Sequence, residues 1–72
     1  MTTYFATYRE TDETTEEWHD YLVQQAGALA SEPSEIETIA DLCATARVSA
    51  LLHDAAGFLV GRVASDGRYW LG

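Results

Sequence analysis

The sequence predicts a small α+β domain in which two helices pack on one face of an antiparallel sheet, in the order β-α-α-β-β-β. Two segments open with a Ser/Thr-x-x-Glu signal and then repeat apolar residues at helical spacing. An aromatic and β-branched segment precedes them, and the C-terminal third alternates apolar with polar residues around two turn signals. A chain of 72 residues has room for one domain, residues 1–72.

The first three elements follow from these local patterns. Residues 4–9, "YFATYR", predict a strand. Thr14 and Glu17 have the spacing of a capping box, and the helix that follows should end near residue 30. At helical spacing this helix repeats Trp18, Leu22, Gln25 and Leu29, with Tyr21 beside them. The break "SEPSE" then leads into a second box, Ser34 with Glu37, and a helix that should end near residue 45. Its apolar side is formed by Ile36, Ile39, Ala40, Cys43 and Ala46.

The positions and lengths of two predicted turns indicate three paired strands in the rest of the chain. A four-residue turn over residues 54–57 places His53 opposite Phe58 and Leu52 opposite Leu59. The dipeptide Asp66-Gly67 predicts a two-residue turn that sets Val63 opposite Trp70. Both turns put apolar residues on one face, which is the consistency that a foldable sequence should show. The expected core combines Trp18, Leu22, Leu52, Leu59, Val63 and Trp70. The pattern leaves the position of the first strand in the sheet open.

The opposite face of this predicted sheet is unusually apolar for a wetted surface. It would carry Ser49, Leu51, His53, Phe58, Val60, Arg62, Tyr69 and Leu71. The first strand and the chain ends could cover it. Alternatively it is a homodimer or partner contact, because contiguous exposed apolar patches mark interaction sites. The residues of this possible second interface are Leu51, Phe58, Val60 and Tyr69.

Charge is distributed unevenly along the chain. The net charge is −8, and residues 10–20, "ETDETTEEWHD", hold six of the twelve acidic residues. Residues 1–41 carry ten acids and one arginine, whereas residues 42–72 carry two acids and three arginines. The acidity therefore belongs to one part of the fold. Lysine is absent, and adaptation to a high-salt habitat would account for that as well as function does.

On the two predicted helices the acids lie away from the apolar side. One interpretation is a solvated surface, in which acids near a helix N-terminus each gain about 0.3 to 1 kcal/mol from the helix dipole. The other is a partner surface, since like charges one turn apart cost about 0.2 to 0.5 kcal/mol per pair without a compensating cation. The candidate partner-binding residues are Glu10, Asp12, Glu13, Glu16, Glu17, Asp20, Glu37 and Asp41.

A partner for such a surface should be basic, and basic protein surfaces mostly hold nucleic acid. Carboxylates spaced along a helix could occupy a DNA-binding groove in place of phosphates. The domain itself should not bind DNA, because its own field repels phosphate. A small acidic housekeeping domain with a salt-adapted surface, and a small homodimeric binding module that uses its apolar sheet face, remain the alternatives.

In its small size, its acidity and its lack of a catalytic motif, the chain resembles the phage-encoded anti-CRISPR inhibitors of type I surveillance complexes. The resemblance rests on "ETDETTEEWHD" and on the acids of "SEPSEIETIAD". It implies a phage protein that binds a Cas subunit, or the assembled Cascade-type complex, and blocks its access to target DNA. These inhibitors share no catalytic residues that could be assigned here.

The sequence offers little for chemistry. Glu16, His19 and Asp20 lack the second His or Cys that a metal site needs, so we expect no metal and no cofactor. A Cys43–His53 nucleophile pair would need an exposed cysteine, but the helical pattern buries Cys43. One cysteine closes no intrachain disulfide, and no signal peptide or membrane segment is evident, so a cytoplasmic, non-enzymatic monomer or weak homodimer is expected.

Overall fold

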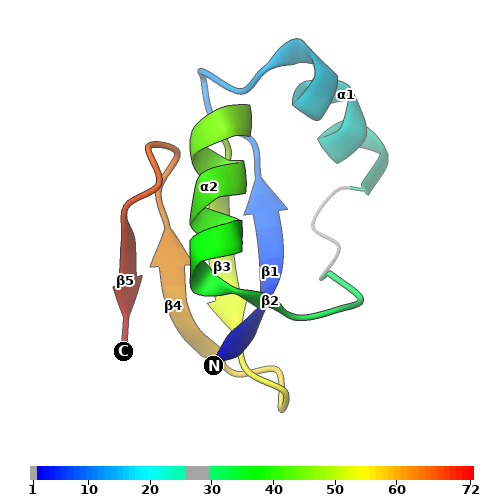
Figure 1. Cartoon of the computed structure of the whole chain (residues 1–72). Coiled ribbons are helices and arrows are strands. Elements are labelled where there is room, and N and C mark those ends of the chain that lie inside the picture. The colour runs from blue at the N-terminus through cyan, green and yellow to red at the C-terminus, as the bar shows by residue number, and fades with distance from the viewer. Residues whose placement is uncertain (1, 26–29) are drawn as a thin grey trace.

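The computed structural model describes residues 2–25 and 30–72, which form a five-stranded antiparallel sheet and two helices (Figure 1). The elements are β1 (Thr3–Arg9), α1 (Glu16–Gln25), β2 (Ser34–Glu35), α2 (Ile36–Ala46), β3 (Ser49–His53), β4 (Leu59–Val63) and β5 (Tyr69–Leu71). The strands are arranged in the order β2-β1-β3-β4-β5. The predicted α+β class is confirmed, but the chain order is β-α-β-α-β-β-β, with one strand more than predicted.

The additional strand, β2, lies where the sequence predicted the second capping box. Ser34 pairs with Tyr4 and Glu35 pairs with Thr3, so this segment extends the sheet beyond β1. Glu35 then has an extended backbone, φ −66° and ψ 151°, and its side chain makes no capping hydrogen bond. The prediction that Ser34 caps the second helix is therefore wrong, because pairing with β1 holds its backbone in a strand.

The N-terminus of α1 is shifted from the predicted capping box by one residue. The carbonyl of Thr15 accepts the first helical hydrogen bond, from His19 N at 2.8 Å, and its hydroxyl accepts one from Trp18 N at 3.4 Å. Thr15, not Thr14, is thus the N-cap. The predicted continuation over residues 26–29, including Leu29, lies outside the described residues. Ala30 is not helical, and its N–H donates to the carbonyl of Ala6 in β1.

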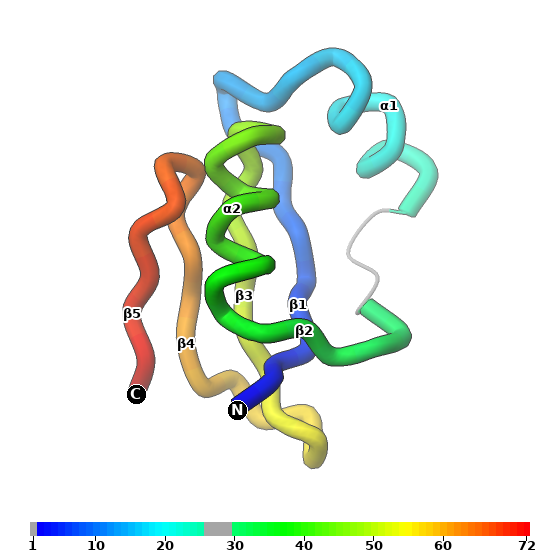
Figure 2. The backbone as a smooth tube through the Cα atoms, viewed as in Figure 1, coloured from blue at the N-terminus to red at the C-terminus, as the bar shows by residue number. Residues whose placement is uncertain are grey.

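The core lies between one face of the sheet and the helices. Helix α2 lies across this face, as the tube in Figure 2 shows, and contacts β1, β3 and β4. Helix α1 adds Leu22, and Trp18 packs edge-on against Tyr8 of β1, with ring centroids 5.7 Å apart. The buried hydrophobic residues are Ala6, Leu22, Ile39, Ala40, Cys43, Ala46, Val48, Ala50, Leu52 and Val63. Trp18 is partly buried against this cluster.

Both hairpins use three-residue loops, which changes the predicted strand register. In the first loop Asp54 N donates to Phe58 O at 3.0 Å, so Asp54 faces Phe58 across residues 55–57. The Asp54 carboxylate also accepts hydrogen bonds from the N–H groups of Ala56 and Phe58. Gly57 takes a φ of 89° at the third loop position, where a three-residue hairpin loop requires a left-handed residue.

A register shift between Leu52 and His53 completes the correction in β4. His53 pairs with Leu59, whereas Leu52 pairs with Gly61, so Val60 is the extra residue of a bulge. Leu59 therefore shares the face of His53 and is 62% exposed, which makes its predicted place in the core wrong. Val60 is partly buried against the core instead of lying on the opposite face.

The second hairpin likewise places Trp70 on the exposed face of the sheet instead of in the core. Ala64 N donates to Arg68 O at 2.7 Å, and the three-residue loop ends in Gly67 with a φ of 91°. The predicted two-residue turn would have placed Val63 opposite Trp70, but Val63 pairs with Tyr69 and Arg62 pairs with Trp70. Because one extra loop residue exchanges the two faces, Trp70 is 49% exposed on the face without helices, and Tyr69 lies on the helix side.

The corrected register predicts very different losses of stability for leucine-to-alanine substitutions on neighbouring strands. Leu52→Ala should lower the free energy of unfolding by about 2 to 5 kcal/mol, because Leu52 is fully buried and the change leaves a cavity. Leu59→Ala should change it by less than about 1 kcal/mol, since its side chain is mostly in water. Denaturant titrations of the two variants measure both values. A Leu59→Ala variant as unstable as Leu52→Ala would show that the first hairpin has a different register.

Candidate functional site

The candidate acidic residues all lie on the surface. All eight, namely Glu10, Asp12, Glu13, Glu16, Glu17, Asp20, Glu37 and Asp41, are exposed. They lie on the segment between β1 and α1, on α1 and on α2. The structure thus brings the predicted acids to the helix side of the molecule, and we call these eight residues the acidic surface.

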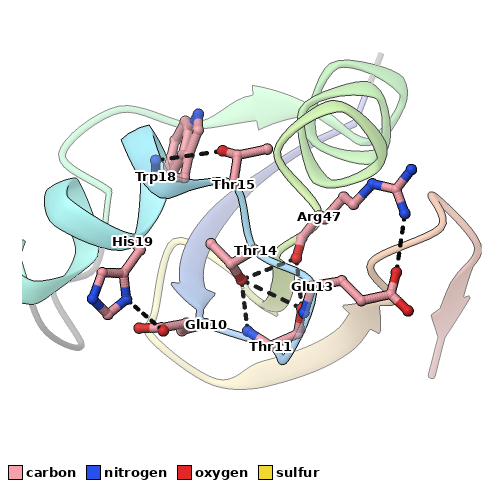
Figure 3. A network of polar contacts seen from close by, with 8 residues as sticks. All are labelled: Glu10, Thr11, Glu13, Thr14, Thr15, Trp18, His19 and Arg47. Atoms are coloured by element: carbon pink, nitrogen blue, oxygen red, sulfur yellow. Dashed lines mark hydrogen bonds and ion pairs between the residues drawn. The ribbon is translucent and has the colours of Figure 1, made fainter.

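Two residues of the acidic surface are engaged with basic side chains. Glu10 Oε1 lies 2.5 Å from Nδ1 of His19, which links the end of β1 to α1. Glu13 Oε2 accepts a hydrogen bond from the Arg47 guanidinium at 3.0 Å (Figure 3). Both pairs are largely exposed, so each contributes at most about 1 kcal/mol.

The remaining six acids make no ion pair with a basic side chain among the described residues. Glu16, Glu17 and Asp20 project from the first turns of α1. Glu37 opens α2, where its carboxylate accepts a 3.4 Å hydrogen bond from the Tyr69 hydroxyl. The helix side of the molecule is therefore strongly negative.

The threonines between these acids have a separate, structural function. The carbonyl of Arg47, just beyond the end of α2, accepts hydrogen bonds from the hydroxyls of Thr11 at 2.6 Å and Thr14 at 3.0 Å (Figure 3). Thr15 N donates to the carbonyl of Ala46, the last residue of α2, at 3.1 Å. The segment before α1 thus caps the C-terminal end of α2, whose carbonyls would otherwise lack partners.

Arg47 makes this capping geometry possible. It has a left-handed backbone, φ 58° and ψ 41°, and ends α2 with hydrogen bonds from its own N–H and that of Val48 to the Cys43 carbonyl. Sequence reasoning missed this site because glycine or asparagine usually occupies such a position. The threonine-rich spacing of "TDETT" was the available signal, but it was assigned to the start of α1.

Two arginines lie on the face without helices. Arg9 pairs with Ser49 at one end of it, and Arg62 stacks on the Trp70 ring, 4.7 Å from the ring centroid. Leu51, Leu59, Arg62 and Trp70 line an open groove of about 210 Å³ together with Gly61 and Gly72. Of the predicted second interface, Leu51 lies on this face, whereas Val60 and Tyr69 do not. Phe58 is 71% exposed at the end of the first hairpin loop.

The residues considered for chemistry are not assembled into a site. Within residues 2–25 and 30–72, no group of three or more His, Cys, Asp or Glu side chains could hold a metal ion. Cys43 is fully buried, and burial raises its pKa from 9.0 to about 11. His53 contacts the Thr7 hydroxyl at 3.3 Å and the Gly57 carbonyl at 3.4 Å. Among the described residues, neither Cys43 nor His53 therefore has the partner that a Cys-His nucleophile requires.

In the described part of the chain, no helix has both the length and the apolar character needed to cross a membrane. Comparisons with protein-family models, with curated proteins and with solved structures found no match.

The capping function of the threonines predicts a stability difference between two similar substitutions. Thr14→Ala should lower the free energy of unfolding by about 1 kcal/mol, because it removes a hydroxyl that accepts from Thr11 N and donates to Arg47 O. Thr45→Ala is the matched control, since Thr45 is an exposed residue of α2 and alanine favours helix. Denaturant unfolding of both variants measures the difference. Equal stabilities would exclude the capping function.

The buried thiol predicts a loss of stability at high pH. Below pH 9 the thiol is protonated in the folded and unfolded chains, so stability is unaffected; above pH 9 the unfolded thiol ionises while the folded thiol does so only near pH 11. The free energy of unfolding should therefore fall between these values. The free energy of unfolding of Cys43→Ala should fall less steeply. Burial and, after it, the charge of Cys43 raise the pKa of Tyr8, so this pKa is raised less in the variant and acts in the same direction. Parallel pH profiles of stability for the parent and Cys43→Ala would contradict the assignment of this effect to Cys43.

Proposed function

We propose that this protein is a non-enzymatic inhibitor or interaction protein that presents its acidic surface to a basic, nucleic-acid-binding partner. The observation that carries the proposal is the exposed acidity of the helix side, where Asp12, Glu16, Glu17, Asp20, Glu37 and Asp41 have no basic partner among the described residues. A protein groove that holds DNA is built to neutralise such a density of negative charge.

The arrangement of α1 supports this proposal. Glu16 and Asp20 are one helical turn apart, a spacing that puts Cβ atoms about 5 to 6 Å from each other, and Glu17 lies beside them. The start of α1 is tied to the end of α2 by hydrogen bonds from Thr14 and Thr15. A surface held in this way loses little conformational freedom on binding, and preorganisation of that kind increases affinity.

The proposed partner is a Cas subunit or the assembled complex of a type I CRISPR system in the cytoplasm of an infected bacterium. The resemblance in size and acidity to inhibitors of these complexes supports that choice. Binding would be competitive with target DNA, because both ligands need the same basic groove. It would carry no sequence specificity, since carboxylates imitate phosphates and not base edges.

Reversing the charge of α1 tests the proposal. In a gel-shift assay of purified type I surveillance complexes with target DNA, the parent protein should displace DNA, and the triple variant Glu16→Lys, Glu17→Lys, Asp20→Lys should not. The loss should appear mainly in the association rate, and parental inhibition should weaken as salt rises, because the screening length is about 8 Å at 0.15 M. Far-ultraviolet circular dichroism should show that the variant keeps its helices.

A pair of single variants provides the matched control. Glu17→Lys and Glu32→Lys change the net charge equally and both residues are exposed, but Glu32 is not part of the acidic surface. Glu17→Lys should weaken inhibition more than Glu32→Lys. Equal effects would mean that only the net charge matters, and an unchanged triple variant would mean that the acids serve solvation.

A further inference from the structure

The strand β5 forms a free edge of the sheet. It pairs with β4 on one side, and no further strand follows it in the sheet order of the described residues (Figure 1). Exposed edges of this kind offer unpaired N–H and C=O groups to another strand. Natural proteins usually protect them with proline or charge, but β5 has the sequence Tyr-Trp-Leu.

The hydrogen bonds within the sheet show which backbone groups of β5 are free. Gly72 N donates to Val60 O and Ala64 N donates to Arg68 O, so the residue pairs at both ends of β5 are hydrogen-bonded. Because such pairs alternate along an antiparallel ladder, the N–H and C=O of Trp70 point towards Arg62 of β4. The N–H and C=O groups of Tyr69 and Leu71 therefore point outwards.

Exposed apolar side chains are concentrated at the same border of the molecule. Tyr69, Trp70 and Leu71 are 38%, 49% and 51% exposed, and Phe58 and Leu59 of the adjacent hairpin are also exposed. A free backbone edge and an apolar surface thus coincide. This combination is the one used in β-augmentation, where backbone bonds join two strands and side chains on both faces are buried.

We propose that β5 pairs with β5 of a second copy of the same chain, antiparallel and centred on Trp70. In this register Tyr69 faces Leu71 of the second copy on the helix side, and all four outward N–H and C=O groups of each strand find a partner. The two Trp70 side chains meet on the other face at a non-hydrogen-bonded position, where side chains approach most closely. The contact is isologous and closes as a dimer.

The distribution of charge favours a second copy of the chain as the binding partner of β5. Six of the eight residues of the acidic surface lie on α1 or on the segment before it. Helix α1 lies towards the edge of the sheet that is opposite to β5 (Figure 1). Near β5 the charges are Arg62, Arg68, Asp66 and Glu37, so the two arginines balance the two acids. Asp66 lies 3.4 Å from Arg68, and the Glu37 carboxylate accepts a hydrogen bond from the Tyr69 hydroxyl. Two chains of net charge −8 can therefore meet at this edge while their α1 acids remain far apart. The strand has three residues and makes a small interface, so the dimer should be weak and should form only as the protein concentration rises.

Sedimentation velocity over a concentration series tests the pairing. The parent should shift from monomer to dimer as the concentration rises, and Leu71→Pro should remain a monomer up to about 1 mM. Proline removes the outward N–H of Leu71 without breaking a bond to β4, and it is tolerated on edge strands. Leu71→Val retains the N–H and should still dimerise. A parent that stays monomeric throughout, or a Leu71→Pro variant that dimerises like the parent, would overturn the proposal.

Disulfide trapping tests the register independently of affinity. Trp70→Cys should form a disulfide-linked dimer under mild oxidation, because its counterpart lies directly opposite within the Cα separation that a disulfide allows. Tyr69→Cys should not, since its own counterpart lies two residues further along the other strand. The native Cys43 is buried and should leave the parent uncrosslinked. Equal crosslinking of the two variants would refute pairing centred on Trp70.

Discussion

The close packing of α2 on the sheet is the interaction on which the rest of the structure depends. Small residues from both layers meet there: Ala40, Cys43 and Ala46 from the helix, and Ala6 and Ala50 from β1 and β3. Side chains of this size let the helix backbone come close to the strands. The position of α2 then fixes two loops, because Thr11 and Thr14 bind its C-terminal end and the Gly67 turn lies close to Ala40 and Ala44. A larger residue in this layer would displace α2 and, with it, both of these loops.

The sequence patterns were sufficient for the fold class, for both helices and for the strands around residues 49–53, 59–63 and 69–71, because apolar periodicity records which segments are buried. They did not determine register. The glycines at the two turns indicate hairpins, yet they are compatible with loops of different length, and the bulge at Val60 has no sequence signature of its own. One residue exchanges the faces of a strand, so Leu59 and Trp70, predicted in the core, lie in water.

The predicted acidic surface was easier to locate than its supporting contacts. Charged side chains on the polar side of a helix are exposed whatever the details of packing, and all eight were placed correctly on the surface. The contacts of Arg47 could not be foreseen, because they join residues more than thirty positions apart and depend on a left-handed residue that is not glycine. The strand β2 was not predicted, because its two residues are too few to show the alternation of apolar and polar residues that marks a strand.

The separation of charge between the two sides of the sheet has a consequence for motion in solution. Acids dominate the helix side, while Arg9 and Arg62 lie on the other face. Such a molecule has an electric dipole moment in addition to its net charge, and a charged surface exerts a torque on it before any contact forms. Approach to a basic surface would turn α1 forward and the arginine-bearing face away. Collisions would then begin in a restricted set of orientations, with the Trp70 side of the sheet directed towards the solvent.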